Sequence, residues 1–387
     1  MAPSLRAEVD VSTALKEMEP RLQGIYERGE WRARRFGGAW LADSSGYTVT
    51  ESLPGERGRK RVRYEIESGK RTVLETPQPD GGRGAEGGIR SPDGTRVLVR
   101  REGNLHVLDQ ESGESVALTK RSRGAPISWG KISWSPDGSR IAFVKSDHSQ
   151  VRERSVLIPG DPSYPKVGRH RFARVGGEIS RLRVGTVEAS GGEIRWVEID
   201  EPEEGMYLGT VAWAGNSEEL VIETLSRFRK KREFLLAHVV SGDVRTLFRE
   251  TDPAWVVASI AKNVGLEWIR KGEAFVVLSE KDGWRHAYVY GRDGKEQLLL
   301  TPGDYDIMGK VRVDEEGGGF YFYASPDNGT QQYLYRVPLD GSGALQRITP
   351  SDQPGTHEYD VSPDARWAFH TYSTFRTPPV TQLVSLP

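Results

Sequence analysis

The sequence contains no cysteine among its 387 residues. This absence excludes disulfide bonds, thiolate metal sites and a cysteine nucleophile, and it is typical of proteins from reducing compartments. The sequence also has no apolar run of about 18 residues. Its first ten residues, MAPSLRAEVD, lack the apolar core of a signal peptide. We therefore expect no membrane span and a cytoplasmic protein, or a periplasmic or secreted one if a signal peptide has been removed.

Net charge is also nearly absent. The 54 Lys and Arg residues are balanced by 55 Asp and Glu residues, which gives a formal net charge of −1. A chain with this balance has no overall electrostatic field that would attract a polyanion. The composition therefore predicts no nucleic acid among the partners of this protein.

The sequence lacks the motifs of a hydrolytic or metal site. A serine nucleophile on a strained turn is written Gly-x-Ser-x-Gly, and this pattern is absent. The seven histidines are scattered, with no His-x-x-x-His pair and no His-Glu-x-x-His motif for zinc. We therefore predict no metal, no cofactor and no catalysis by this chain alone. A third hypothesis, a propeller enzyme with an axial metal, finds no repeated set of ligands.

What the sequence does contain is one turn that recurs. It reads SPDG at residues 91–94 and 135–138, and an alternating strand follows each copy. Related turns follow the segments that begin near residues 40, 211, 266, 311 and 359, with most steps about 45 residues long. A Gly-containing hairpin turn separates two further strands in several units. Each unit therefore holds about four strands, the content of one propeller blade. We predict an all-β protein, a β-propeller of four-stranded blades, with seven blades recognisable. A β-sandwich is the alternative, but sandwiches seldom sustain one period over seven units.

Two segments interrupt the repeat. Residues 10–35 have helical spacing of apolar residues, so we predict a short helix that packs on the outside or on one end of the propeller. Residues 148–180 form an insertion with three prolines, which predicts an extended loop or edge strand projecting from a blade. The predicted domains are therefore an N-terminal extension over residues 1–35 and a single propeller over residues 36–387.

Several stretches together are similar to one known family. Tyr164-Pro165-Lys166 lies in the insertion after an SPDG blade, and Trp284-Arg285-His286 lies in the stretch SEKDGWRHAYVY. With the final stretch THEYDVSPDARWAFHTYSTFRTPPV, these resemble the N-terminal propeller of the dipeptidyl peptidase IV family, in the prolyl oligopeptidase clan of serine peptidases. The resemblance implies eight blades capping an α/β-hydrolase domain, and no such hydrolase domain is present in this sequence. We expect the six signature residues to be structural.

The resemblance also implies a pair of glutamates that binds the free amino terminus of a peptide substrate. The family carries this pair before the blade with the Tyr-Pro-Lys insertion, but residues 118–138 contain no glutamate here. Glu203 and Glu204 precede the next blade instead. We interpret them either as a relocated amine anchor or as a solvated acidic loop.

The basic run Arg227–Arg232, RFRKKR, lies between two strands of one unit. We expect a solvated hairpin tip, with contact to an acidic partner as the alternative.

Two hypotheses for the function follow. The chain is the non-catalytic propeller portion of a dipeptidyl peptidase IV-like serine peptidase, gating substrate access and supporting domain or subunit contacts. Alternatively, it is a stand-alone binding or scaffold propeller derived from such a peptidase. The partners are then a peptide substrate or an α/β-hydrolase domain if the chain is truncated, and otherwise a protein partner, with a homodimer as a further possibility.

Overall fold

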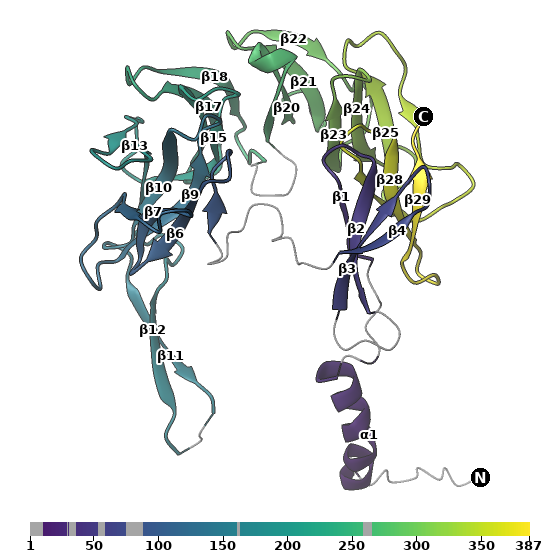
Figure 1. Cartoon of the computed structure of the whole chain (residues 1–387), viewed down its shortest axis with the longest axis horizontal. Coiled ribbons are helices and arrows are strands. Elements are labelled where there is room, and N and C mark those ends of the chain that lie inside the picture. The colour runs from purple at the N-terminus through teal and green to yellow at the C-terminus, as the bar shows by residue number, and fades with distance from the viewer. Residues whose placement is uncertain are drawn as a thin grey trace, which may run out of the picture. The chain divides into compact units, whose positions relative to one another are not determined.

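A computed structural model describes residues 11–28, 30, 36–52, 59–74, 88–160, 163–257 and 265–387 (Figure 1). The chain divides into two compact units, one of residues 1–74 and 353–386 and the other of residues 75–352 with Pro387. The described residues form eight antiparallel sheets, of which six have four strands, one has three and one has two. The seven sheets with three or four strands correspond to the seven repeats in the sequence.

The first unit combines the two ends of the chain. It holds a four-stranded sheet in the order β1-β2-β3-β4 and a three-stranded sheet in the order β27-β28-β29. Its elements are α1 (Val11–Tyr26), β1 (Gly38–Trp40), β2 (Gly46–Ser52), β3 (Arg59–Glu65), β4 (Arg71–Leu74), β27 (Thr356–Val361), β28 (Trp367–Ser373) and β29 (Val380–Ser385).

The second unit holds the other six sheets. Four are simple meanders, β5 to β8, β15 to β18, β19 to β22 and β23 to β26. The sheet in the order β14-β13-β10-β9 is interrupted by the separate hairpin of β11 and β12. The strands are β5 (Ile89–Arg90), β6 (Arg96–Arg101), β7 (Asn104–Asp109), β8 (Ser115–Ala117), β9 (Ile127–Trp134), β10 (Arg140–Asp147), β11 (Glu153–Ile158), β12 (Lys166–Arg171), β13 (Arg181–Glu188), β14 (Arg195–Trp196), β15 (Met206–Trp213), β16 (Glu219–Ser226), β17 (Lys231–His238), β18 (Val244–Thr251), β19 (Leu266–Ile269), β20 (Ala274–Ser279), β21 (His286–Gly291), β22 (Glu296–Leu299), β23 (Gly309–Asp314), β24 (Gly319–Ala324), β25 (Tyr333–Pro338) and β26 (Gln346–Arg347), with a 3-10 turn, η1 (Arg270–Gly272).

The core of each unit lies between neighbouring sheets. Every residue of β20 and β21 is buried, so this sheet is apolar on both faces. On one side, Tyr290 packs edge-on against Phe248 of the preceding sheet, with ring centroids 5.3 Å apart. In the first unit, Trp40 of β1 stacks on Phe369 of β28 with centroids 4.2 Å apart. Burial of the sheet faces against each other is the main favourable contribution to this fold.

The SPDG turn fulfils its own hydrogen-bonding requirements. The Ser135 hydroxyl donates to the carboxylate of Asp137 at 2.6 Å and accepts from the backbone N–H of Arg140 at 2.9 Å. The same carboxylate accepts from the backbone N–H of Ser139 at 2.9 Å. Gly138 has a φ of +69°, in the left-handed region that favours glycine. Ser, Asp and Gly are therefore favoured by the turn itself, which explains why the motif is repeated.

The turn also links one sheet to the next. The backbone N–H of Asp137 donates to the hydroxyl of Ser217 at 3.1 Å, in the corresponding turn of the following repeat. In the first unit, the backbone N–H of Asp364 donates to the hydroxyl of Ser44 at 3.0 Å. This second bond joins the last sheet of the chain to the first. The same position of the motif therefore holds adjacent sheets together in both units.

Helix α1 is present, as the spacing predicted, and its packing on the outside or on one end of the propeller stays a prediction. Its apolar side chains are exposed, at Leu15, Met18, Leu22 and Ile25. Helical spacing places these four on one side of the helix. Spacing indicates which side of the helix is apolar and does not indicate what covers it.

The insertion is present where the sequence predicts it. Strands β11 and β12 pair from Glu153 opposite Arg171 to Ile158 opposite Lys166, and the hairpin extends away from the sheet of β10 and β13 (Figure 1). We name β11, β12 and their connection the arm hairpin.

Two buried histidines form a hydrogen-bonded chain in the sheet of β27 to β29. His357 lies 2.9 Å from the carbonyl oxygen of Gln353, which only accepts, so the Nε2 of His357 carries the proton. The Nδ1 of His357 is then an acceptor, and the Nε2 of His370 donates to it at 2.8 Å. The side-chain amide of Gln382 donates to the Nδ1 of His370 at 3.3 Å. In this arrangement every hydrogen bond of the chain is satisfied with both rings neutral.

Substitution at the φ-positive position of the turn tests its local requirements. The last repeat reads SPDA, and Ala365 adopts a φ of +56° where the two SPDG copies have Gly94 and Gly138. We expect Ala365→Gly to raise the free energy of unfolding by about 1 kcal/mol, because it relieves left-handed strain on a residue with a Cβ. Gly138→Ala should lower the free energy of unfolding by a similar amount, since its added methyl would meet only ordinary van der Waals contacts. Urea denaturation of both variants measures this. Equal effects of the same sign would contradict the strain argument.

The buried histidine pair makes stability depend on pH. Burial, together with the neighbouring His357, lowers the pKa of His370 from 6.5 to about 4. The unfolded chain therefore binds more protons than the folded one between these values. The contribution of neutral His370 to the free energy of unfolding is expected to be fully present above pH 6.5. It should fall as the pH drops from 6.5 towards 4. His370→Gln should reduce this slope in denaturant titrations across the window, whereas His170→Gln on the exposed arm hairpin should leave it unchanged. A slope unaffected by His370→Gln would refute this assignment.

Candidate functional site

The residues that the sequence singled out share one end of the sheets in the second unit. This is the end where β9, β15 and β19 begin and from which the arm hairpin projects, and we name it the arm end. Since strands in these sheets are antiparallel, the arm end also carries the turn between β16 and β17 and the turn between β20 and β21. The structure thus places Glu203 and Glu204 and the run from Arg227 at the arm end of one sheet, and the Trp284 stretch at the arm end of the next sheet along the chain.

The loop of Glu203 and Glu204 is held by two arginines through its backbone. A guanidinium nitrogen of Arg181 donates to the carbonyl oxygen of Glu203 at 2.8 Å, and one of Arg227 donates to that of Glu204 at 2.9 Å. Arg227 also donates to the carbonyl oxygen of Gly177 at the base of the arm hairpin. Both glutamates are exposed. The two guanidinium groups reduce the negative potential that an ammonium ion would meet here. The role of this pair as an amine anchor stays a prediction.

A cation–aromatic cluster lies beside this loop. The guanidinium group of Arg229 lies 5.1 Å from the ring centre of Tyr207 and 5.7 Å from that of Trp255. The backbone N–H of Val256 donates to the carbonyl oxygen of Arg229 at 2.7 Å, which fixes the segment after β18 against the turn. The turn of residues 227–230 is thus ordered by contacts with its neighbours.

The stretch Trp284-Arg285-His286 stabilises the turn between β20 and β21. The His286 ring is buried, and its Nδ1 lies 2.8 Å from a carboxylate oxygen of Asp282. Arg285 pairs with Glu280 at 2.7 Å, and its backbone N–H donates to the carboxylate of Asp306 at 2.7 Å. Trp284 is partly exposed. These contacts are what a structural role would require.

The stretch Tyr164-Pro165-Lys166 lies at the far end of the arm hairpin. Tyr164 has 81% of its surface exposed, and Lys166 is the first residue of β12. These residues are therefore separated from the Glu203 loop by the length of the hairpin, and the structure does not bring the two into one site.

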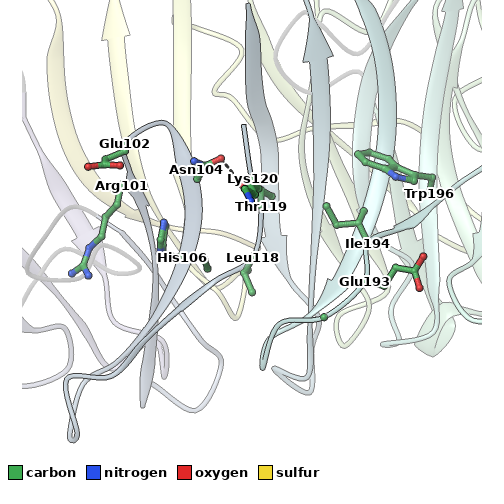
Figure 2. A pocket seen from close by; sticks show the side chains of 12 residues that line it. Arg101, Glu102, Asn104, His106, Leu118, Thr119, Lys120, Glu193, Ile194 and Trp196 are labelled. Atoms are coloured by element: carbon green, nitrogen blue, oxygen red, sulfur yellow. Dashed lines mark hydrogen bonds between the residues drawn. The ribbon is translucent and has the colours of Figure 1, made fainter. Parts of the chain in front are cut away.

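A separate hollow of about 720 Å³ lies where β7 and β8 meet the segment around β14 (Figure 2). It carries cations and anions, from Arg101 and Lys120 and from Glu102 and Glu193, with the indole of Trp196 on one wall. It contains none of the residues that the sequence predicted for the site. Over the described ranges, no group of three or more His, Asp or Glu side chains could hold a metal ion. No helix in the same part of the chain is long and apolar enough to cross a membrane.

Comparison with known proteins places the chain in a family. Residues 61–379 match the family model described as the dipeptidyl peptidase IV (DPP IV) N-terminal region. The chain belongs to this DPP IV N-terminal family. The probable dipeptidyl-aminopeptidase B of Aspergillus oryzae is 24% identical over 80% of the chain and 38% of its own length. The probable dipeptidyl peptidase 4 of Emericella nidulans is 24% identical over 64% of the chain and 35% of its own length.

The fold agrees with this assignment. The crystal structure of Porphyromonas gingivalis dipeptidyl peptidase 4 superposes with a TM-score of 0.71 and 19% identity, over 92% of this chain and 51% of that one. The predicted propeller fold is thereby confirmed. The chain spans about half of that solved protein and less than two fifths of the two curated relatives. It matches the propeller part of DPP IV peptidases, and no hydrolase domain is evident among its described residues.

This DPP IV N-terminal region contains one buried ionic network that was not predicted from the sequence. Arg232 has only 1% of its side chain exposed and pairs with Glu223 at 2.8 Å and with Glu250 at 3.5 Å. It also donates to the carbonyl oxygen of Leu278 in the next sheet at 3.0 Å, while Glu250 accepts from the hydroxyl of Ser279 at 2.6 Å. The network therefore joins the sheet of β15 to β18 to the sheet of β19 to β22.

The prediction that the whole run Arg227–Arg232 is a solvated tip was therefore wrong for Arg232. Residues 227–230 form the turn, but β17 begins at Lys231 and its alternation turns Arg232 into the protein. The available signal was Glu223, a carboxylate in the apolar interior of the strand ELVIETLS. A charge in such a strand requires a partner.

Removing the cation of this network should be costly. We expect Arg232→Met to lower the free energy of unfolding by about 3–5 kcal/mol, because it leaves two buried carboxylates without their counter-ion. Arg249→Met removes an exposed arginine that pairs with Glu233 in the same sheet, and should cost less than about 1 kcal/mol. Urea denaturation of both variants decides this. Equal losses of unfolding free energy would show that the buried network contributes no more than an exposed ion pair.

Proposed function

We propose that this chain is the non-catalytic propeller portion of a dipeptidyl peptidase IV-like serine peptidase, and that it gates substrate access and contacts the hydrolase domain. The observation that carries this proposal is the coverage, since 92% of the chain matches only 51% of the solved dipeptidyl peptidase. The solved relative therefore contains a further half that has no counterpart in this sequence. The absence of a Gly-x-Ser-x-Gly motif in the sequence supports the division of labour.

The exposed side of α1 supports a domain contact. Helix α1 carries an exposed apolar stripe that consists of Leu15, Met18, Leu22 and Ile25. Contiguous exposed apolar surface marks sites of interaction. A hydrolase domain that covers this stripe would bury four large side chains and so contribute to the stability of the complete enzyme.

A stand-alone binding propeller is the second candidate. The specific observation in its favour is the absence of any glutamate from residues 118–138, where the resemblance implies an amine anchor. Under this alternative, the arm end would bind a protein partner and no hydrolase would be involved.

An activity assay separates the two parts of the proposal. The purified 387-residue chain should release no dipeptide from a dipeptidyl-p-nitroanilide, whereas the native polypeptide from the source organism should release it. Hydrolysis by the purified chain alone, surviving further purification, would contradict a non-catalytic role.

The helix contact has its own test in the native polypeptide. Leu22→Asp should lower the midpoint of thermal unfolding of the native polypeptide by several degrees and should weaken the contact between propeller and hydrolase. Gln23→Asp introduces the same charge on another side of α1 and should leave this midpoint unchanged. Equal effects of the two substitutions would show that the apolar side of α1 does not contact the hydrolase domain.

A further inference from the structure

The arm hairpin has no core of its own. Its two strands form a separate two-stranded sheet, so each strand has one edge without a neighbour among the described residues. Strand alternation places Leu157 and Val167 on one face and Ile158 and Lys166 on the other, and all four are exposed. A two-stranded hairpin exposed on both faces is only marginally stable in water. The hairpin is therefore suited to being covered by something else.

A hollow lies at the base of the hairpin. It has a volume of about 940 Å³ and is lined by residues 149–155 and 171–178, where the hairpin leaves the sheet of β10 and β13. Its wall includes the exposed side chains of Phe172 and Val175. This volume is within the range of pockets that hold small ligands or a few peptide residues.

The charge of this region contrasts with the rest of the chain. Segment 149–178 of the sequence includes six cations, Arg152, Arg154, Lys166, Arg169, Arg171 and Arg174, and three anions, Glu153, Asp161 and Glu178. The whole sequence has a net charge of −1. The arm hairpin and its base are therefore a local positive patch on a chain with almost no net charge.

Two of the three anions of this segment pair with arginines. Glu153 pairs with Arg171 at 3.5 Å, and Glu178 lies 3.9 Å from Arg181. Arg171 is further held by the carbonyl oxygen of Val151 at 2.6 Å. These two carboxylates therefore neutralise Arg171 and Arg181.

Three arginines of the hollow form no ion pair with a carboxylate of the described residues. They are Arg152, Arg154 and Arg174. The contact that the structure gives Arg154 is with the ring of Phe172, 5.9 Å from its centre. Guanidinium groups bind carboxylates in a planar, two-pronged geometry. Three such groups around one hollow, beside an exposed aromatic ring, form a surface for a ligand that is both acidic and partly apolar.

We propose that the hollow at the base of the arm hairpin binds an acidic peptide segment of a partner protein. Carboxylates of the segment pair with Arg152, Arg154 and Arg174, and an apolar side chain of the segment packs on Phe172. The positive patch also accelerates encounter with an acidic partner and makes the binding depend on salt. This binding surface goes beyond the proposed peptidase role, because it involves neither the Glu203 loop nor a hydrolase domain.

The proposal is tested by fluorescence anisotropy with the full chain. The probe is a fluorescein-labelled peptide Asp-Glu-Phe-Glu-Asp-Leu, and its amide analogue Asn-Gln-Phe-Gln-Asn-Leu is the control ligand. We expect the acidic peptide to bind, the amide peptide to bind at least about tenfold more weakly, and added salt to weaken the acidic peptide alone, since the hydrogen bonds to charged groups are lost. Equal binding of the two peptides would overturn the proposal.

Variants locate the site. Arg152→Gln, Arg154→Gln and Arg174→Gln should each weaken the acidic peptide about five- to tenfold. Arg123→Gln removes an exposed arginine outside the arm hairpin and should leave the affinity unchanged. A loss of affinity with Arg123→Gln equal to that of the three others would show a diffuse charge effect and overturn the site.

Sedimentation velocity distinguishes a second copy from a separate partner. If the chain forms dimers that the three variants dissociate and the acidic peptide does not displace, the occupant is a second copy and the proposal is wrong. Displacement of the labelled peptide by the unlabelled acidic peptide, with the chain monomeric throughout, supports it.

Discussion

Burial of sheet faces against neighbouring sheets is the constraint on which this structure depends. In β20 and β21 every side chain is buried, and six of the eight residues of β16 are buried as well. A sheet that is apolar on both faces has no stable form alone in water, so each one requires a neighbour on either side. The hydrogen bonds of the recurring turn then fix how one sheet meets the next, through Asp137 and Ser217 in one unit and Asp364 and Ser44 in the other. The Arg232 network adds an ionic connection of the same kind.

This arrangement leaves the connections between strands available for function. At the arm end, the sheets present the Glu203 loop, the turn of residues 227–230 and the arm hairpin, each held by contacts from its neighbour. Arg227 illustrates this, since it bonds both to the Glu204 carbonyl and to the base of the hairpin. Packed sheets that carry exposed connections are suited to binding and positioning, which agrees with membership of the DPP IV N-terminal family.

The fold could be predicted because its signals are local. Ser and Asp in the recurring turn make hydrogen bonds within that turn, and Gly adopts its positive φ. The helical spacing near the N-terminus predicts α1 from the residues of the helix itself. What covers α1 could not be predicted, because that depends on surfaces distant in the sequence. The inward direction of Arg232 was missed for a similar reason, since it follows from the pairing with Leu225 and Glu250. The histidine pair also escaped notice, because His357 and His370 are separated in sequence and meet only when β27 pairs with β28.

The most direct measurement is the mass of the native polypeptide in its source organism, with its peptides mapped by mass spectrometry. The account predicts a mass well above the 43.2 kDa of this chain, and peptides beyond Pro387 that contain a Gly-x-Ser-x-Gly sequence. A native mass of 43.2 kDa would contradict it, and the chain would then be a free-standing propeller whose function lies in binding alone.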